Sequence, residues 1–227
     1  GLDKVNVFTV RNVSDINNLN QFLNLSKQAG TKEVTVIGGG FIGVEVAENL
    51  QQSGYKVTLI EGTEQILRPF DYDMVQIFHK ELMDEGVELL VEEKVTGFAK
   101  DTVISSSGRE IYAGTVVMAI GVSPEVGLAK EAGLVIGDTG AIKVNKNYQT
   151  SDSDIYAVGD AVEIYHALSH SFTKLSLAGP ALKQARTAAD HIHQKETSNR
   201  GYIGSSAIKV FGYNGASTGL NESLIRA

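Results

Sequence analysis

Residues Val34 to Gly43 decide the fold, and they read Val-Thr-Val-Ile-Gly-Gly-Gly-Phe-Ile-Gly. The first four residues are apolar or β-branched, which is typical of a short buried strand. The glycines predict a tight turn, and the apolar spacing from Phe41 to about Gln52 predicts a helix. We therefore expect this stretch to fold as a strand, a turn and a helix.

A second strand follows the helix. Gly54 ends the helical pattern, and the run from Lys56 to Glu61 is largely apolar and ends in an acid. Two strands joined by a helix form a βαβ unit, which requires a right-handed crossover and a parallel sheet covered by helices. The expected fold class is therefore α/β, with a Rossmann-like domain built on a parallel sheet.

The same alternation continues along the chain. A helix is expected from about Asp71 to Asp84, and a second helix, opened by Pro180, should run to His193. The apolar face of the first of these helices is predicted to hold Tyr72, Val75, Ile77, Phe78 and Leu82. Further strands are expected at residues 87–91, 115–120 and 154–158, with a turn at 107–108 and a polar linker at 194–201.

Composition narrows the class of protein. The 227 residues are 42% hydrophobic and carry a formal net charge of −7, and their scattered basic residues argue against a nucleic-acid partner, which would require a basic face. No run approaches the roughly 18 apolar residues of a membrane span, and the first residues lack the apolar core of a signal peptide. We therefore expect a cytoplasmic protein with no membrane partner.

Cysteine is absent, which excludes disulfides, thiolate metal sites and cysteine nucleophiles within this chain. His191 and His193 are close in sequence, but two residues apart on a helix they point to different sides. No metal site is expected.

Gly38, Gly40 and Gly43 fit the G-x-G-x-x-G pattern of dinucleotide-binding turns. Such glycines allow a tight turn, close approach of a pyrophosphate and close packing of the helix on the strand, while backbone N–H groups at the helix start face the phosphates. The pattern alone is weak, and the alternative is a glycine-rich structural turn. The strand before it and the helix after it favour dinucleotide binding.

Glu61 lies at the end of the second strand, 18 residues after Gly43. A carboxylate at this place can accept hydrogen bonds from the adenosine ribose, and it would repel the extra phosphate of NADP. The next residues, Gly62-Thr63-Glu64, contain no arginine or lysine that would hold that phosphate. NAD is therefore favoured over NADP, the alternative being that Glu61 is a solvated strand end.

With these residues, the chain resembles the pyridine nucleotide-disulfide oxidoreductases, a family of FAD-dependent enzymes. The glycine stretch through Glu45 is similar to the family's NAD-site signature, and residues 150–161, which end in Gly159-Asp160-Ala161, closely resemble its second flavin motif. Three further stretches are similar to family segments: Ala119–Pro124 beside the nicotinamide, Leu177–Arg186 at the flavin ring, and Ala216–Glu222 at the opening of the dimerisation domain.

The resemblance implies roles for individual residues. The implied NAD-site residues are Gly38, Gly40, Phe41, Ile42, Gly43, Glu45, Glu61 and Gly121, and the implied FAD-site residues are Gly159, Asp160, Leu177 and Ala178. Phe41 would be the aromatic gate over the flavin, or else a core residue. Glu45 would lie near the nicotinamide carboxamide, or else be an exposed acid on the helix. Ser123, Glu125 and Ala185 depart from residues that are common in the family.

The resemblance also implies a domain order. Residues 1–121 would form the NAD-binding domain, residues 122–199 the C-terminal part of an FAD-binding domain, and residues 200–227 the start of a dimerisation domain. The family's first flavin turn and its redox cysteine are not found, so no catalytic residue is expected in this chain, which is interpreted as an internal piece of a longer, homodimeric protein.

The implied activity is transfer of a hydride from NADH to FAD and onward to a small-molecule acceptor: a disulfide, a peroxide or oxygen. Within the family, the single-cysteine branch of CoA-disulfide reductases and NADH oxidases or peroxidases is preferred. An isolated piece should bind NADH weakly, hold FAD poorly and show negligible catalysis. The alternative is a stand-alone NAD-binding module without redox turnover. A classical two-substrate dehydrogenase is disfavoured because no histidine or tyrosine-lysine pair is placed to act as acid or base.

Overall fold

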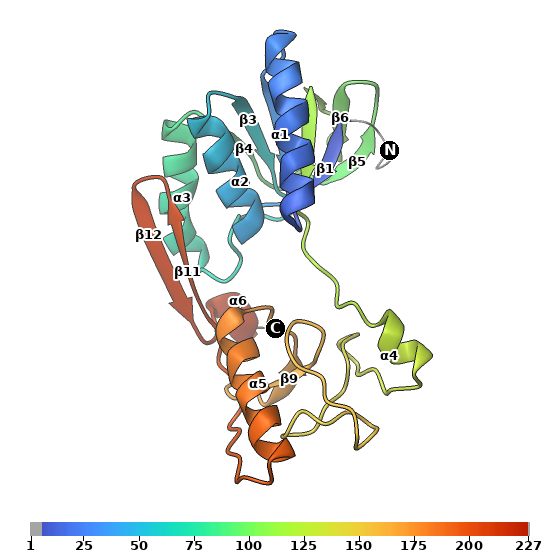
Figure 1. Cartoon of the computed structure of the whole chain (residues 1–227). Coiled ribbons are helices and arrows are strands. Elements are labelled where there is room, and N and C mark those ends of the chain that lie inside the picture. The colour runs from blue at the N-terminus through green and yellow to red at the C-terminus, as the bar shows by residue number, and fades with distance from the viewer. Residues whose placement is uncertain (1–5, 227) are drawn as a thin grey trace. The chain divides into compact units, whose positions relative to one another are not determined.

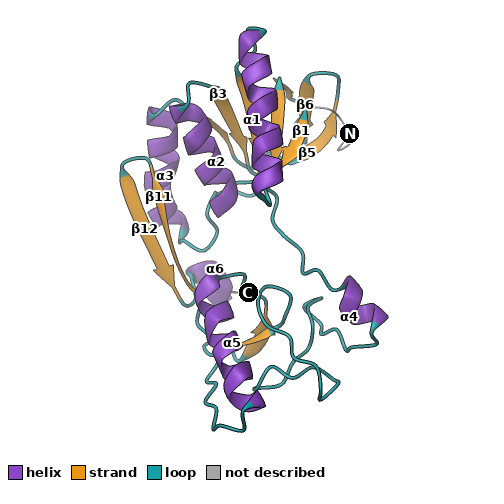
Figure 2. Cartoon of the chain, in the orientation of Figure 1, coloured by secondary structure: helices purple, strands orange, loops and turns teal. Residues whose placement is uncertain are grey.

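The computed structural model describes residues 6–226, which form two compact units (Figures 1 and 2). Unit 1 contains the chain up to Gly121, together with Ala207–Ser217 and the residues from Asn221 onward. Unit 2 contains Val122–Ser206 and Thr218–Leu220. Each unit has its own hydrophobic core.

Unit 1 is built on a five-stranded parallel sheet with the strand order β1-β8-β2-β3-β4. The strands are β1 (Val7–Thr9), β2 (Glu33–Ile37), β3 (Lys56–Ile60), β4 (Glu88–Leu90) and β8 (Thr115–Met118). The run Val34–Ile37 of β2 is buried throughout, as expected for the centre of a parallel sheet. The predicted α/β class with a parallel sheet is confirmed.

Three helices cover one face of this sheet: α1 (Val13–Gln28), α2 (Phe41–Gln52) and α3 (Tyr72–Asp84). One core cluster joins Leu23 of α1, Val44 of α2 and Phe78 of α3 to strand residues such as Val36 and Leu59. The helix α1 was not predicted from the sequence. It is capped by Asn12, whose side chain accepts a hydrogen bond from the Asp15 N–H at 2.9 Å.

The general expectation of a parallel sheet covered by helices holds for one face only, because strands cover the other face. A small antiparallel sheet contains β5 (Val95–Phe98), β6 (Thr102–Ser105) and β7 (Glu110–Tyr112). Val103 and Ile111 of this sheet pack with Ile37 and Ile60 of the parallel sheet in a second core cluster. The alternation of short apolar runs around residues 107–108 therefore reflects strands that are half buried.

The predicted apolar face of α3 was partly wrong. Val75, Phe78 and Leu82 are buried, but the side chains of Tyr72 and Ile77 are 52% and 48% exposed. The buried stripe instead includes His79, because positions 75, 78, 79 and 82 follow the three- and four-residue spacing of one helix face.

A hairpin from the far end of the chain completes unit 1. It consists of β11 (Ser205–Val210) and β12 (Tyr213–Thr218), and Ile208, Val210 and Phe211 belong to the same core cluster as α1, α2 and α3. The short helix α6 (Glu222–Arg226) follows.

Unit 2 holds α4 (Gly127–Glu131), β9 (Ile164–His166), β10 (Ser171–Thr173) and α5 (Ala178–Ile192). The helix α5 begins two residues before Pro180, so that the proline is its third residue. The strand predicted at residues 154–158 is absent: Tyr156 forms only an isolated bridge with Gln149, and Ile155 and Val158 are exposed. A strand requires a ladder of hydrogen bonds to a neighbour, and the described residues provide no such ladder here.

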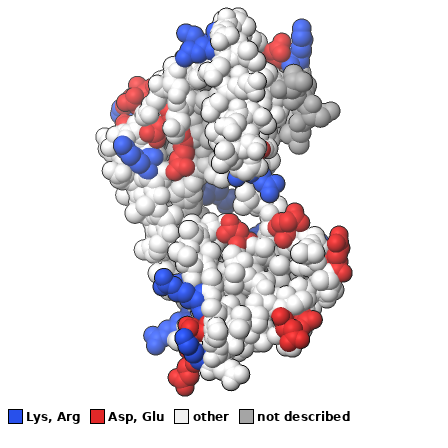
Figure 3. Space-filling model, in the orientation of Figure 1, with Lys and Arg blue, Asp and Glu red and all other residues white. Residues whose placement is uncertain are grey.

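Within residues 6–226, no helix is long and apolar enough to cross a membrane. Over the same range, no group of three or more histidine, aspartate and glutamate side chains could hold a metal ion. On the face drawn in Figure 3, lysine and arginine side chains are interspersed with acidic ones.

Candidate functional site

The glycine turn connects β2 to α2 in unit 1, and packing requires glycine at two of its positions. Gly38 has φ +108°, and an added Cβ would lie 2.4 Å from the carbonyl oxygen of Ala119, just after β8. A Cβ at Gly43 would lie 1.8 Å from the carbonyl oxygen of Gly38. These glycines allow the turn to approach β8 and the helix to approach the turn.

Gly40 differs from these two glycines. It is the N-cap residue of α2 with φ −74°, and no atom lies within 4 Å of the position that its Cβ would occupy. No side chain caps this helix, and its first turn contains no acidic residue. The first N–H groups of a helix carry partial positive charge and lack partners within the helix. The start of α2 can therefore receive an anion, and Gly40 leaves room for its approach.

Glu61 contacts the glycine turn directly. Its Oε2 accepts a hydrogen bond from the Gly39 N–H at 2.7 Å, and its Oε1 accepts hydrogen bonds from the N–H and the hydroxyl of Thr63 at 2.8 and 2.9 Å. The carboxylate is half buried. The two sequence-predicted features, the glycine turn and the acid at the end of β3, therefore lie together at the carboxyl edge of the sheet.

The loop after β3 supports the glycine turn from the other side. The N–H of Leu67, whose φ is +48°, donates to the carbonyl oxygen of Gly39 at 2.7 Å. The neighbouring N–H of Ile66 donates to Nε2 of His79 on α3 at 3.2 Å. Burial lowers the pKa of His79, which keeps the ring neutral and its Nε2 available as an acceptor. His79 was not predicted from the sequence, because a lone histidine in a helix carries no local signal for this contact.

The remaining predicted NAD-site residues lie on α2 and at the end of β8. Phe41 is half buried and packs against the core cluster, whereas Ile42 and Glu45 are exposed. Gly121 is exposed, with φ +101° and open space at its Cβ position. The Ala119 N–H donates to the Ile37 carbonyl oxygen at 2.8 Å, so the ends of β2 and β8 are adjacent. The strand order reverses between these two strands, which is where open parallel sheets bind ligands.

In unit 2, one buried side chain joins the two predicted flavin segments. The N–H of Gly159 donates to Oε1 of Gln184, on α5, at 2.6 Å. Gln184 is fully buried, and its Nε2 has no hydrogen-bond partner among the described residues. Gly159 has φ +93°. Gln184 was not predicted as a site residue, because its hydrogen bond to Gly159 joins segments that are distant in sequence.

The other predicted FAD-site residues surround this link. Asp160 follows Gly159 and is exposed, Leu177 is the N-cap of α5, and Ala178 is the first residue of that helix and exposed. The helix α5 has no capping side chain and no acidic residue in its first turn. Its start, like that of α2, can therefore face negative charge.

Comparisons with known proteins show which proteins this chain resembles. The chain is 32% identical over 228 residues to an NADH oxidase of Enterococcus faecalis, an alignment that covers 98% of the chain and 50% of that protein. It is 28% identical to a coenzyme A disulfide reductase of Staphylococcus haemolyticus, covering 97% of the chain and 50% of that protein. The chain thus spans about half the length of the curated relatives it matches.

Solved structures show the same likeness. The reduced CoADR-RHD of Bacillus anthracis matches with a TM-score of 0.93 and 42% identity, covering 97% of this chain and 40% of that one. A NAD-dependent persulfide reductase of A. fulgidus matches with a TM-score of 0.93 and 30% identity, covering 99% and 42%. The sequence model of the pyridine nucleotide-disulphide oxidoreductases matches residues 1–191. The family resemblance predicted from the sequence is therefore confirmed, and the chain belongs to the pyridine nucleotide-disulphide oxidoreductase family.

Proposed function

We propose that this chain is the NADH-binding part, together with a portion of the FAD site, of a flavoprotein oxidoreductase that passes a hydride from NADH to FAD and onward to a disulfide, peroxide or oxygen acceptor. The observation that carries the proposal is that the three glycines of the turn differ in the space around their Cβ positions. Packing fills the space at Gly38 and Gly43 but leaves Gly40 open at an uncapped helix start. This is the arrangement that a dinucleotide pyrophosphate requires.

NADH would be held along the carboxyl edge of the parallel sheet. The N–H groups at the start of α2 and the backbone of Gly40 would contact the pyrophosphate, and Glu61 would accept hydrogen bonds from the adenosine ribose. Phe41 is proposed as the aromatic gate, Glu45 as a contact of the nicotinamide carboxamide, and Gly121 as a backbone position that leaves room for the nicotinamide end.

The residues of unit 2 fit part of a flavin site. Asp160 would accept hydrogen bonds from the ribitol or pyrophosphate region, while Leu177 and Ala178 at the start of α5 would direct backbone N–H groups toward the flavin ring. Bound FAD would supply the redox chemistry by accepting a hydride from NADH. The protein would orient the two rings and stabilise negative charge on the reduced flavin.

The names of the relatives indicate the acceptor class. They include NADH oxidase, coenzyme A disulfide reductase and CoA-dependent NAD(P)H sulfur oxidoreductase. We therefore favour the single-cysteine branch of the family. Residues 1–227 contain no cysteine, so a redox thiol has to come from outside them, and no residue of this chain is proposed as catalytic. Residues 200–227 are proposed to begin a dimerisation domain of a homodimeric protein.

Nucleotide titration tests the NADH site. Gly40→Ala should weaken NADH binding about tenfold or more, because the added Cβ occupies the space left for the pyrophosphate. Gly97→Ala is the matched control, since its Cβ would make only an ordinary contact of 3.9 Å with Ile104. Unchanged NADH affinity in Gly40→Ala, or tighter binding of NADPH than of NADH by the unaltered chain, would overturn the assignment.

The proposed hydride transfer to FAD can be tested only in the complete natural protein. We expect it to be yellow, to contain FAD, and to bleach when NADH is added without oxygen. The competing function, an NAD-binding module without redox turnover, predicts a colourless protein that still binds NADH. The visible absorption spectrum therefore separates the two.

A further inference from the structure

The loop after β4 runs alongside the residues that follow β3. The Glu93 N–H donates to the carbonyl oxygen of Glu61 at 3.0 Å, and the Glu92 N–H donates to the carbonyl oxygen of Thr63 at 2.8 Å. Residues 92–94 therefore lie next to the acid that is proposed to bind the adenosine ribose.

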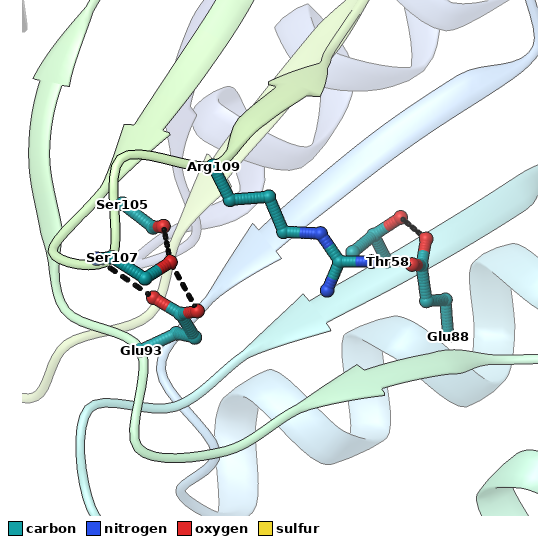
Figure 4. Close-up of polar contacts among 6 residues, drawn as sticks. All are labelled: Thr58, Glu88, Glu93, Ser105, Ser107 and Arg109. Carbon is teal, nitrogen blue, oxygen red and sulfur yellow. Dashed lines mark hydrogen bonds and ion pairs between the residues drawn. The ribbon is translucent and has the colours of Figure 1, made fainter.

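The small antiparallel sheet fixes the same loop from its other side. The Lys94 N–H donates to the Ser106 hydroxyl at 3.1 Å, and the Ser106 N–H donates to the Lys94 carbonyl oxygen at 2.7 Å. The Glu93 carboxylate accepts a hydrogen bond from the Ser107 hydroxyl at 2.6 Å (Figure 4). This hydrogen bond is the main cause that lowers the pKa of Glu93, so the carboxylate stays charged and the anchor persists.

These hydrogen bonds place the basic residue Lys94 near Glu61, where the adenosine ribose of the dinucleotide is proposed to bind. Its stem packs over Gly62, the residue after Glu61: a Cβ on Gly62 would lie 3.0 Å from Lys94 Cγ and 3.8 Å from Cε. Lys94 is exposed, and no ion pair joins its ammonium group to a described residue. The nearby Arg109 is engaged differently, because its guanidinium lies 3.5 Å from the carboxylate of Glu88 (Figure 4).

The Glu61 carboxylate is already engaged on both oxygens. Its charge is directed at the N–H groups of Gly39 and Thr63, which partly offset it. A phosphate on the neighbouring ribose hydroxyl would meet the repulsion of Glu61 and of the exposed Glu64, but also the ammonium group of Lys94. An ammonium on a flexible stem is well suited to bind phosphate as a point charge.

We propose that Lys94 is a specificity-determining residue that binds the 2′-phosphate of NADPH, so that the site accepts NADPH as a second and weaker dinucleotide. The inference rests on the proposed function, because it assumes that the adenosine ribose lies at Glu61. The sequence favoured NAD because of the Glu61 carboxylate and because residues 62–64 contain no basic residue. Lys94 belongs to the loop after β4, and its side chain packs on Gly62.

The test measures dissociation constants for NADH and NADPH in the unaltered chain, in Lys94→Met and in Lys56→Met. Methionine keeps an apolar stem over Gly62 and removes the charge. Lys56 is an exposed lysine at the start of β3, at the opposite edge of the sheet, and serves as the matched control. Lys94→Met should weaken NADPH binding about tenfold and change NADH binding less than about twofold, while Lys56→Met changes neither.

Binding of 2′,5′-ADP and 5′-ADP, which lack the nicotinamide, tests whether the effect of Lys94 on affinity depends on the 2′-phosphate alone. Lys94→Met should weaken 2′,5′-ADP but leave 5′-ADP unchanged, and rising salt should reduce the difference. Equal NADPH affinity in the variant and the unaltered chain would overturn the inference while leaving the proposed NADH site intact. An equal loss of affinity for both dinucleotides would also overturn the inference, because the effect would not depend on the 2′-phosphate. If neither dinucleotide binds to any of the three proteins, the proposed function fails as well.

Discussion

In the glycine turn, Gly43 is expected to matter for the stability of unit 1 and Gly40 for nucleotide binding. Gly43→Ala should destabilise unit 1 by about 3 kcal/mol, because its Cβ would overlap the carbonyl oxygen of Gly38 at 1.8 Å and the backbone cannot yield without distortion. Gly40→Ala should cost about 1 kcal/mol or less, since the space at its Cβ is open. Hydrogen exchange of the β2 and β3 amides measures the loss of stability in each of the two variants. Similar losses in the two variants would contradict the division of roles.

His79 makes the stability of unit 1 depend on pH. Its pKa is lowered from the usual 6.5 by burial, so at mildly acidic pH the unfolded chain binds the proton more readily than the folded one. The free energy of unfolding should therefore fall as the pH drops below about 6.5. Protonation would also turn Nε2 into a donor facing the Ile66 N–H.

Replacement of His79 checks this effect. His79→Gln can still accept the Ile66 N–H but does not titrate, so hydrogen exchange of unit 1 should depend less on pH between about pH 7.5 and 5.5 than in the unaltered chain. His79→Leu leaves that N–H buried without a partner and should cost about 1–3 kcal/mol at neutral pH. The same pH dependence in His79→Gln would assign it to other groups.

The residues of the candidate site that could be predicted lie within one local motif, whereas the missed residues contact segments that are distant in sequence. Gly38, Gly40, Gly43 and Glu61 could be predicted because their spacing within one βαβ unit is itself the signal. His79, Gln184 and Lys94 act through contacts between segments that are distant in sequence. No local pattern encodes such contacts, because they depend on how the elements pack.

At the scale of elements, the two helix starts are built alike. Gly40 at α2 and Gly179 at α5 both have open space at their Cβ positions and ordinary backbone angles, and neither helix has a capping side chain. The fold does not require glycine at either place. We propose that the shared reason is the approach of a ligand to backbone N–H groups.

Gly179→Ala should therefore stabilise α5 and weaken flavin binding. Alanine removes conformational freedom from the unfolded chain and should add about 0.5–1 kcal/mol to the stability of unit 2. In the complete protein, the FAD content after dialysis should fall. The control Ala189→Gly, at an exposed position near the end of the same helix, should destabilise it by about as much without loss of FAD. Full retention of FAD by Gly179→Ala would remove the start of α5 from the flavin site.

Elements with strong patterns were predicted best. The helix α2 and the strands β2 and β3 lie within a residue of their predicted bounds, because a buried parallel sheet selects continuous apolar runs. The run 154–158 has the same character but forms no strand, since strand formation depends on a neighbour as well as on sequence. The helix α1 escaped notice because only Leu19 and Leu23 of its 16 residues are buried.

At the scale of the whole molecule, the boundary between the units falls within one strand. Ser205 and Ser206 of β11 belong to unit 2, whereas Ala207–Ser217 belong to unit 1. The hairpin that follows packs closely on α3 and the loop before it: a Cβ on Gly215 would lie 2.5 Å from Phe78 Cζ, and the Gly212 N–H donates to Glu81 Oε1 at 2.8 Å. Residues 207–217 therefore complete the core of unit 1.

Val210 offers a direct test of this dependence. Its side chain is fully buried in the core of unit 1, and Val210→Ala should lower the stability of that unit by about 2 kcal/mol through lost burial and a residual cavity. Hydrogen exchange of the β2 and β3 amides, which are far from Val210 in sequence, should accelerate accordingly. Lys209→Ala, at the exposed neighbouring position of β11, should change the same amides by less than about 0.5 kcal/mol. If Val210→Ala leaves β2 and β3 unaffected, then unit 1 folds without the hairpin, and residues 207–217 act only where the chain meets another part of the protein.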